Sequence, residues 1–387
     1  MAHQTIHHSR FFANPQEPLT NVQPHQELLA SLERINTTNA PVHTCSTGWN
    51  FHGLYTGPTS IAYLFYRLSQ IYPDLEFKQQ SFSDWTQEYL DLGSRVNHSD
   101  PDPDHCGVAS ETLAHLALSA VVRKDASLVK KLCSYEPIIN TSNEDGSNEW
   151  LYGRAGYLYF LRLCRAAFGQ EKQDETSKLL ERTVERTVAR ILGARQPWTW
   201  HGKQYLGAVH GMVGIICQVV LSMPSTAKNV QSLLSGLLDK QFKSGNFPSS
   251  LPVGNDKLVQ FCHGGPGFVL SLQSLLPHFP VLEDKIETAI ARAQVDIMER
   301  GVLRKEPCLC HGIASNALAL PAGNAQQFEV FLSCMSTSSI EKLGWTKHEK
   351  GRSDEIASLY TGEAGRAWVW AVADKGLPRS CIGYNDF

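Results

Sequence analysis

The sequence has no long apolar run and no marked excess of charge. No stretch approaches the ~18 consecutive apolar residues of a membrane-spanning helix, and the net charge over 387 residues is only −3. A general nucleic-acid surface needs a basic excess, so we expect neither a nucleic-acid partner nor integral membrane association. The polar first residues, 1–18, lack an apolar signal core, which leads us to expect a cytoplasmic protein.

Signals for strands and for phosphate chemistry are also scarce. Alternating strand-like patterns are rare, and neither a P-loop nor a kinase signature is present. A glycosidase would need two carboxylates across its site, and Glu111, Glu149 and Glu363 form no convincing pair. Ten cysteines are present, and in a cytoplasmic protein they are expected to be thiols or metal ligands instead of disulfides.

One pattern recurs seven times: G-x-x-[G/S] followed by an apolar run. The leading glycines stand 46 to 58 residues apart, at Gly57, Gly107, Gly153, Gly211, Gly264, Gly312 and Gly362. Between them lie amphipathic segments, such as 177–194 and 282–300, with apolar residues at helical spacing. Each repeat is therefore predicted to form a buried inner helix that starts at the glycine pair and an outer helix with a polar face.

Seven such helical hairpins predict an all-α fold, an (α/α)7 toroid in which a double ring of helices closes on itself. We expect residues 41–387 to form this single domain and residues 1–40 to form a polar extension with a short helix. Any single glycine pair, taken alone, is explained by close packing of the helices. The ring matters for function because it gathers seven helix starts, and the polar loops before them, at one end.

Two of these loops carry Cys-His-Gly triplets. Cys262 and Cys310 each stand two residues before the leading glycine, and His311 follows Cys310. If the repeats converge on one axis, these three residues can hold zinc and leave a fourth position open, as catalytic zinc sites do. The alternative is that the cysteines are small buried residues and His311 binds the backbone, but the matching register favours zinc. Cys308 has no matching residue in another repeat, and His263, adjacent to Cys262, is expected to hydrogen-bond locally or to face the substrate.

Five segments carry a family resemblance: "WLYGRAGYLYFL" (150–161), "YLGAVHGMVGI" (205–215), "CHGGPGFV" (262–269), "LCHGIASNA" (309–317) and "SLYTGEAG" (358–365). With them the sequence resembles the lanthionine synthetase C-like (LanC-like) family, especially its eukaryotic branch. The resemblance implies the seven-fold toroid and a Zn²⁺ ion held by Cys262, Cys310 and His311. It also implies that His210 is the acid/base residue, although a histidine before a buried helix is often structural.

The resemblance further implies that basic residues near the site hold the carboxylates of glutathione. Lys305 matches one of these positions, and Arg352 matches another with an offset of one residue. Ordinary surface charge is the alternative explanation for both. Gln260 departs from the family pattern, because relatives tend to have histidine there, and this departure bears on substrate identity.

Together these residues predict zinc-dependent thiol conjugation. Glutathione or a cysteine thiol would add to a dehydroamino acid or another Michael acceptor, in a dehydrated peptide or a small molecule made elsewhere. Zinc coordination deprotonates a thiol, and His210 would protonate the resulting enolate, with His263 and Tyr152 as the other candidate donors. Two alternatives stay open: a non-catalytic glutathione-binding or scaffold protein, and a tailoring enzyme for a small unsaturated metabolite. A zinc prenyltransferase-like barrel is disfavoured, since no Asp stands at a repeat start.

Overall fold

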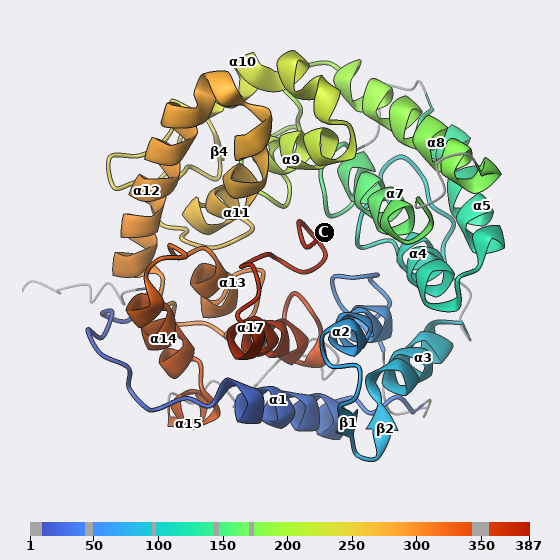
Figure 1. Ribbon diagram of the computed structural model, residues 1–387. Coiled ribbons are helices and arrows are strands. Elements are labelled where there is room, and N and C mark those ends of the chain that lie inside the picture. The colour runs from blue at the N-terminus through green and yellow to red at the C-terminus, as the bar shows by residue number, and fades with distance from the viewer. Residues whose placement is uncertain (1–9, 43–48, 95–97, 142–146, 170–173, 343–355) are drawn as a thin grey trace, which may run out of the picture.

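The helices form two concentric rings around one axis (Figure 1). The computed structural model describes residues 10–42, 49–94, 98–141, 147–169, 174–342 and 356–387. The inner ring consists of α2 (Pro58–Ile71), α4 (Glu111–Arg123), α7 (Arg154–Phe168), α9 (Met212–Ser222), α11 (Gly265–Leu275), α13 (Ile313–Leu318) and α17 (Glu363–Lys375). Each inner helix contacts the next, and α17 contacts α2. The predicted all-α toroid is confirmed.

The outer ring covers the inner one, helix by helix. Its members are α3 (Phe82–Gly93), α5 (Ala126–Ser134), α8 (Glu175–Leu192), α10 (Ala227–Leu238), α12 (Glu283–Arg300), α14 (Ala325–Cys334) and α1 (Pro24–Thr38). Each packs on the inner helix of its own repeat, and α1 packs on α17. The helix expected within residues 1–40 is therefore α1, and it supplies the outer partner of the seventh inner helix. A domain boundary at residue 41 stays a prediction.

Short elements fill the connections. They are the helices α6 (Glu136–Ile139) and α15 (Thr337–Lys342), the 3-10 turns η1 (Pro224–Thr226), η2 (Leu276–His278) and η3 (Pro280–Leu282), and four two-residue strands. The strands β1 (Glu76–Phe77) and β2 (Gln80–Ser81) pair with each other, as do β3 (Gln204–Tyr205) and β4 (Ser250–Leu251). Across the described residues, no helix is both long enough and apolar enough to span a membrane.

The glycine pairs start the inner helices by letting backbone approach backbone. Six of the seven inner helices have the leading glycine as N-cap, and α4 has Ser110. Gly264 has a φ of +122°, which only glycine adopts without strain. A Cβ on Gly267, the second glycine of that pair, would lie 2.1 Å from the carbonyl oxygen of Phe261. The start of α11 can therefore lie directly on the loop that carries Cys262.

The loops before the inner helices are themselves joined into a ring by backbone hydrogen bonds. The N–H of Cys262 donates to the C=O of Cys310 (3.1 Å), the N–H of Cys310 to that of Tyr360 (2.8 Å), and the N–H of Tyr360 to that of Tyr55 (3.2 Å). All four residues stand two positions before a leading glycine. Residues in equal register in successive repeats are thus neighbours in space, and the seventh repeat is joined to the first.

Candidate functional site

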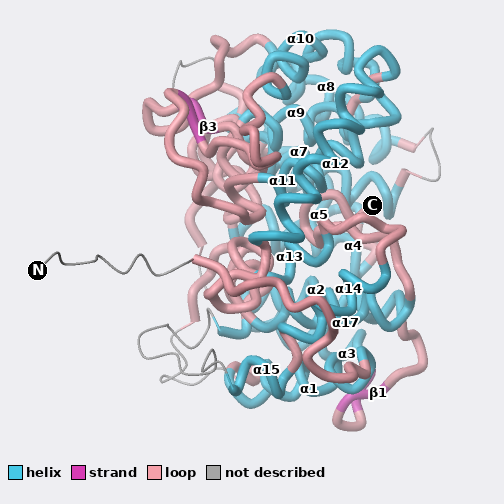
Figure 2. Tube along the Cα trace, turned by 90° about the vertical axis from the view of Figure 1, so that its left-hand side faces the viewer, coloured by secondary structure: helices cyan, strands magenta, loops and turns pink. Residues whose placement is uncertain are grey.

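The loops before the inner helices collect at one end of the ring, where Figure 2 shows loops on the left and helices filling the rest of the molecule. Cys262 and Cys310 lie there side by side, both buried. Their thiols hydrogen-bond each other. Gln260 Nε2 donates to Cys262 Sγ (3.0 Å), and the Tyr55 hydroxyl donates to Cys310 Sγ (3.0 Å). Each sulfur therefore accepts a hydrogen bond from a neutral donor.

These hydrogen bonds separate the acidities of the two thiols. The bond from Cys310 lowers the pKa of the Cys262 thiol, in spite of burial, and Gln260 and the charge of Lys305 lower it further. The same bond raises the pKa of Cys310 well above its ordinary value. Of the two thiols, Cys262 is therefore the more acidic. Burial raises the pKa of Cys308 to about 12, so that thiol stays neutral.

The two cysteine thiols suit a soft divalent metal, but the predicted third ligand, His311, is not grouped with them. Two adjacent thiols with outer hydrogen bonds are the environment that zinc thiolates need. Within the described ranges, however, no three His, Cys, Asp or Glu side chains gather closely enough to hold a metal ion. His311 directly follows Cys310, and burial, with Lys305 nearby, lowers the pKa of its imidazole, which favours the neutral form that binds metals. Two cysteine side chains thus lie side by side, and the neutral imidazole of His311 follows them in the chain.

His210, at the start of α9, is held by a buried carboxylate. Its Nδ1 lies 3.1 Å from Glu149 Oε2, and the Glu149 side chain is 1% exposed. Glu149 also accepts the backbone N–H groups of Leu151 (2.7 Å) and Tyr152 (2.5 Å). Because the carboxylate accepts, Nδ1 carries a hydrogen, and Nε2 is left as the atom that exchanges a proton. Sequence reasoning considered Glu149 only as a glycosidase carboxylate and missed this role.

Aromatic rings fix the imidazole of His210 from one side. The Trp200 ring stacks on it, with centroids 4.0 Å apart and planes 6° apart, and Tyr152 stacks on Trp200 at 5.8 Å and 9°. Burial raises the pKa of the Tyr152 phenol. Trp200 lies in the hairpin that leads into β3, outside the repeat pattern. Sequence reasoning missed it, and the only signal was the aromatic cluster "WTW" (198–200) before the fourth repeat.

His263 links the histidine side of the site to the cysteine side. Its ring centroid lies 6.1 Å from that of His210 and 5.6 Å from that of Tyr205. Its buried Nδ1 has no hydrogen-bond partner among the described residues. Burial lowers the pKa of His263 to about 4, with smaller contributions from His210 and Lys203, so the ring is neutral. Because His263 follows Cys262 in the chain, the ring cluster around His210 lies next to the loop that carries Cys262.

Of the two residues predicted to bind carboxylates, Lys305 and Arg352, the structure describes only Lys305. Lys305 is partly buried, and its charge acts on both Cys262 and His311. Its positive charge is therefore close enough to lower the pKa of the Cys262 thiol. Arg352 lies outside the described residues. The assignment of Cys262, Cys310, His311, His210 and the other site residues to roles stays a prediction.

The fold is a closed double ring of seven helix pairs, and the loops at one end carry two adjacent cysteines and a histidine held by a carboxylate. The family model for "Lanthionine synthetase C-like protein" matches residues 48–372, and the chain belongs to this family. The predicted resemblance is thereby confirmed.

Relatives and a solved structure agree with this assignment. The chain is 28% identical over 368 residues to "Glutathione S-transferase LANCL1" of Danio rerio, covering 89% of this chain and 86% of that protein. It is 30% identical over 243 residues to "LanC-like protein GCL1" of Arabidopsis thaliana, covering 58% and 54%. The structure of nisin cyclase superimposes with a TM-score of 0.54 at 13% identity, over 94% of this chain and 97% of that one, which shows a shared fold.

Proposed function

We propose that this protein is a zinc-dependent enzyme that adds the thiol of glutathione, or of a cysteine residue, to an electron-poor alkene such as a dehydroamino acid. The observation that carries the proposal is the pair of adjacent buried cysteines, Cys262 and Cys310, next to His263, whose ring lies 6.1 Å from that of His210, the histidine held by Glu149. The printed name of the zebrafish relative, a glutathione S-transferase, supports glutathione as the thiol. Membership of a family that includes thioether-forming cyclases supports the reaction class.

Cys262, Cys310 and His311 would hold the zinc ion, with His311 approaching the two sulfurs that are already adjacent. The chemistry that bound zinc supplies is to keep an incoming thiol deprotonated. Lys305 would bind a carboxylate of that thiol substrate, since it is the cation beside the pair. Gln260 and Tyr55 would hold the cysteine sulfurs in place through their hydrogen bonds.

His210 would complete the reaction. As the sulfur bonds to the β-carbon of the acceptor, the C=C π bond breaks and its electron pair moves toward the α-carbon and carbonyl. Nε2 of His210 would first take the proton that the thiol loses and would then deliver it to the α-carbon, which returns the imidazole to its neutral form. Trp200 and Glu149 would keep the imidazole ring of His210 from turning, which would hold Nε2 toward the α-carbon of the acceptor.

Mass spectrometry of the purified protein with glutathione and a panel of dehydroalanine peptides and small enones tests this function. We expect a thioether product with the parent protein. His210→Asn should keep zinc and glutathione binding and lose about 10²–10⁴-fold in rate, the usual contribution of a general acid. Binding of glutathione without turnover, and unchanged by His210→Asn, would instead identify a non-catalytic glutathione-binding protein.

A further inference from the structure

The last residues described, Ser380–Phe387 (the tail), lie in the middle of the inner ring, where Figure 1 places the C-terminus. The tail follows α17 and lies beyond the segment matched by the family model, which ends at residue 372. Its contacts reach inner helices on several sides of the axis: α2, α7, α9, α11 and α17. The tail therefore occupies the axis that the ring encloses.

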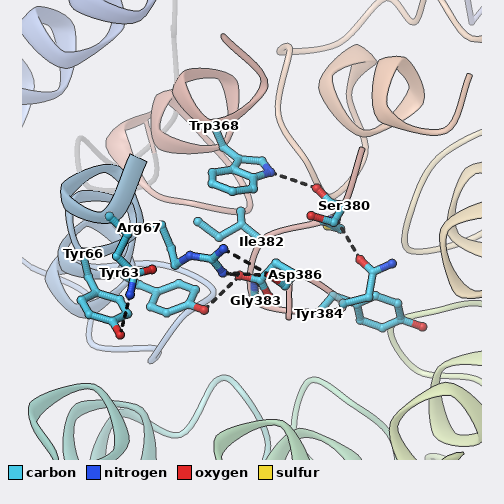
Figure 3. A network of polar contacts seen from close by, with 12 residues as sticks. Tyr63, Tyr66, Arg67, Trp368, Ser380, Ile382, Gly383, Tyr384 and Asp386 are labelled. Carbon is cyan, nitrogen blue, oxygen red and sulfur yellow. Dashed lines mark hydrogen bonds and ion pairs between the residues drawn. The ribbon is translucent and has the colours of Figure 1, made fainter. Parts of the chain in front are cut away.

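A buried charge pair anchors the end of the tail. Asp386, with a fully buried side chain, pairs with Arg67 of α2 (Figure 3). It also accepts hydrogen bonds from the hydroxyls of Tyr63 (3.0 Å) and Tyr159 (2.9 Å) and from the N–H of Gly383 (3.1 Å). An apolar plug would fill the axis without the desolvation cost of two buried charges. A hydrogen-bonded polar network instead specifies one position for the segment it holds.

Tyr384 connects this anchored tail to the loop that carries Cys262. Its hydroxyl is 2.6 Å from Ser271 Oγ of α11, and its ring is fully buried. The ring packs edge-on against Trp150, with centroids 5.6 Å apart, and against Phe261, at 5.1 Å. Phe261 directly precedes Cys262, so the position of Tyr384 bears on the backbone of that cysteine.

Tyr360 connects the tail to Cys310. Its hydroxyl donates to the carbonyl oxygen of Ile382 (2.6 Å), and its ring stacks on that of Tyr55 with centroids 5.6 Å apart and planes 12° apart. Tyr55 in turn donates to Cys310 Sγ (3.0 Å). The Cys310 N–H also donates to the Tyr360 carbonyl (2.8 Å). The tail is thus joined to the Cys310 thiol in three steps. Ile382 accepts a hydrogen bond from Tyr360, Tyr360 stacks on Tyr55, and Tyr55 donates to the sulfur.

We propose that the tail is the floor of the thiol site and that it positions both sulfurs, Cys310 through Tyr360 and Tyr55, and Cys262 through Phe261. The tail residues are positioning residues, since among the described contacts they reach Sγ of Cys262 and Cys310 only through other side chains. The importance of the sulfur positions for catalysis rests on the proposed function, but the positioning itself does not. It can be measured on the thiols without any turnover.

The test compares two buried tyrosines that each lose a hydrogen bond to a backbone carbonyl when changed to phenylalanine; Tyr360→Phe also loses a 3.5 Å contact with Cys381 Sγ, which belongs to the tail itself. Tyr360→Phe removes the bond to Ile382, and Tyr157→Phe removes a bond to Leu132 (2.9 Å) on the outer side of α7, away from the tail. Both variants should lower the melting temperature by similar amounts. Two further measurements on each are the alkylation rate of Cys310 by iodoacetamide in chelator-treated protein, resolved by peptide mass spectrometry, and the zinc dissociation constant by chelator competition.

We expect Tyr360→Phe to change the alkylation rate of Cys310 severalfold and to weaken zinc binding about 10-fold, as loss of an outer partner of a metal ligand usually does. Tyr157→Phe should leave both values at those of the parent. Asp386→Asn should act in the same direction as Tyr360→Phe although it lies at the far end of the tail. Tyr55→Phe combined with Tyr360→Phe should have less than the summed effect, since both act through one contact.

The proposal is overturned if Tyr360→Phe and Asp386→Asn lower the melting temperature but leave thiol alkylation and zinc affinity unchanged, because the tail would then be packing alone. Failure of the proposed function gives a different pattern. The parent would then make no thioether product, while the alkylation rate of Cys310 would still respond to the tail variants and not to Tyr157→Phe.

Discussion

Replacing Glu149 with glutamine keeps the shape of the side chain and removes its charge and one of its acceptor atoms. In the parent, one carboxylate oxygen accepts from Leu151 N–H and His210 Nδ1–H, and the other accepts from Tyr152 N–H and from the Ser147 hydroxyl (3.2 Å). Both oxygens therefore face backbone donors. In Glu149→Gln the amide NH₂ must face a backbone N–H in either orientation.

The structure sets the size of the expected effects on the free energy of unfolding and on turnover. Leaving one buried donor unsatisfied costs about 1–3 kcal/mol, so the free energy of unfolding should fall by roughly that amount. With the NH₂ group on the His210 side, Nδ1 must accept, and the imidazole changes tautomer. Loss of the correct tautomer in a comparable histidine–carboxylate pair costs ~10⁴ in turnover, so we expect a loss of about 10²–10⁴ here.

The assay measures urea denaturation, zinc content and thioether formation on one preparation. Ser147→Ala is the matched control, because it removes a contact to the same carboxylate and leaves His210 untouched. It should lose some stability and keep its turnover. Parental turnover per folded molecule in Glu149→Gln would refute the reasoning, since the carboxylate would then be a backbone anchor with no bearing on the proton.

Three further experiments test the zinc ligands, the buried acid Glu111 and the aromatic ring stacked on His210. Elemental analysis should find about one zinc per chain, lost in Cys310→Ala and kept in Cys308→Ala; the reverse outcome would contradict the ligand assignment. Burial raises the pKa of Glu111 to about 7, so the folded state holds this proton more tightly than the unfolded state, and the stability it contributes is lost as pH rises from ~4.5 through about 7. In urea denaturation, the free energy of unfolding of Glu111→Gln should therefore rise relative to that of the parent by up to ~3 kcal/mol between pH 5 and pH 8. A difference that stays constant with pH would contradict the assignment of Glu111 as a buried acid. Trp200→Ala frees one face of His210 and should lower turnover about 10-fold or more at full zinc content, whereas unchanged turnover would limit Trp200 to packing.

The repeat pattern made the ring and the cysteine pair predictable. Equal register in a closed ring makes equivalent residues neighbours, and Cys262 and Cys310 share that register, so their contact followed from counting residues. The glycines also marked where six of the seven inner helices begin.

The parts of the site outside the repeat pattern could not be read in this way. Glu149 reaches His210 across 61 positions, and Tyr63 reaches Asp386 across 323. Such contacts are made by irregular loops and by the tail, which have no period to indicate their partners. Trp200 lies in a hairpin inserted before the fourth repeat, so no equivalent residue in another repeat pointed to it.

The pairing of α1 with α17 has a consequence for the newly made chain. Arg34 of α1 forms an ion pair with Glu363 of α17, 329 positions later in the sequence. At a synthesis rate of 5–20 residues per second, α1 waits on the order of 20–60 s for its partner. During that time the apolar side chains that it later buries, Leu28, Leu32 and Ile35, have no α17 to cover them. Helix α1 is thus made long before α17 and reaches its native packing late, so its apolar face is open to chaperones during that interval.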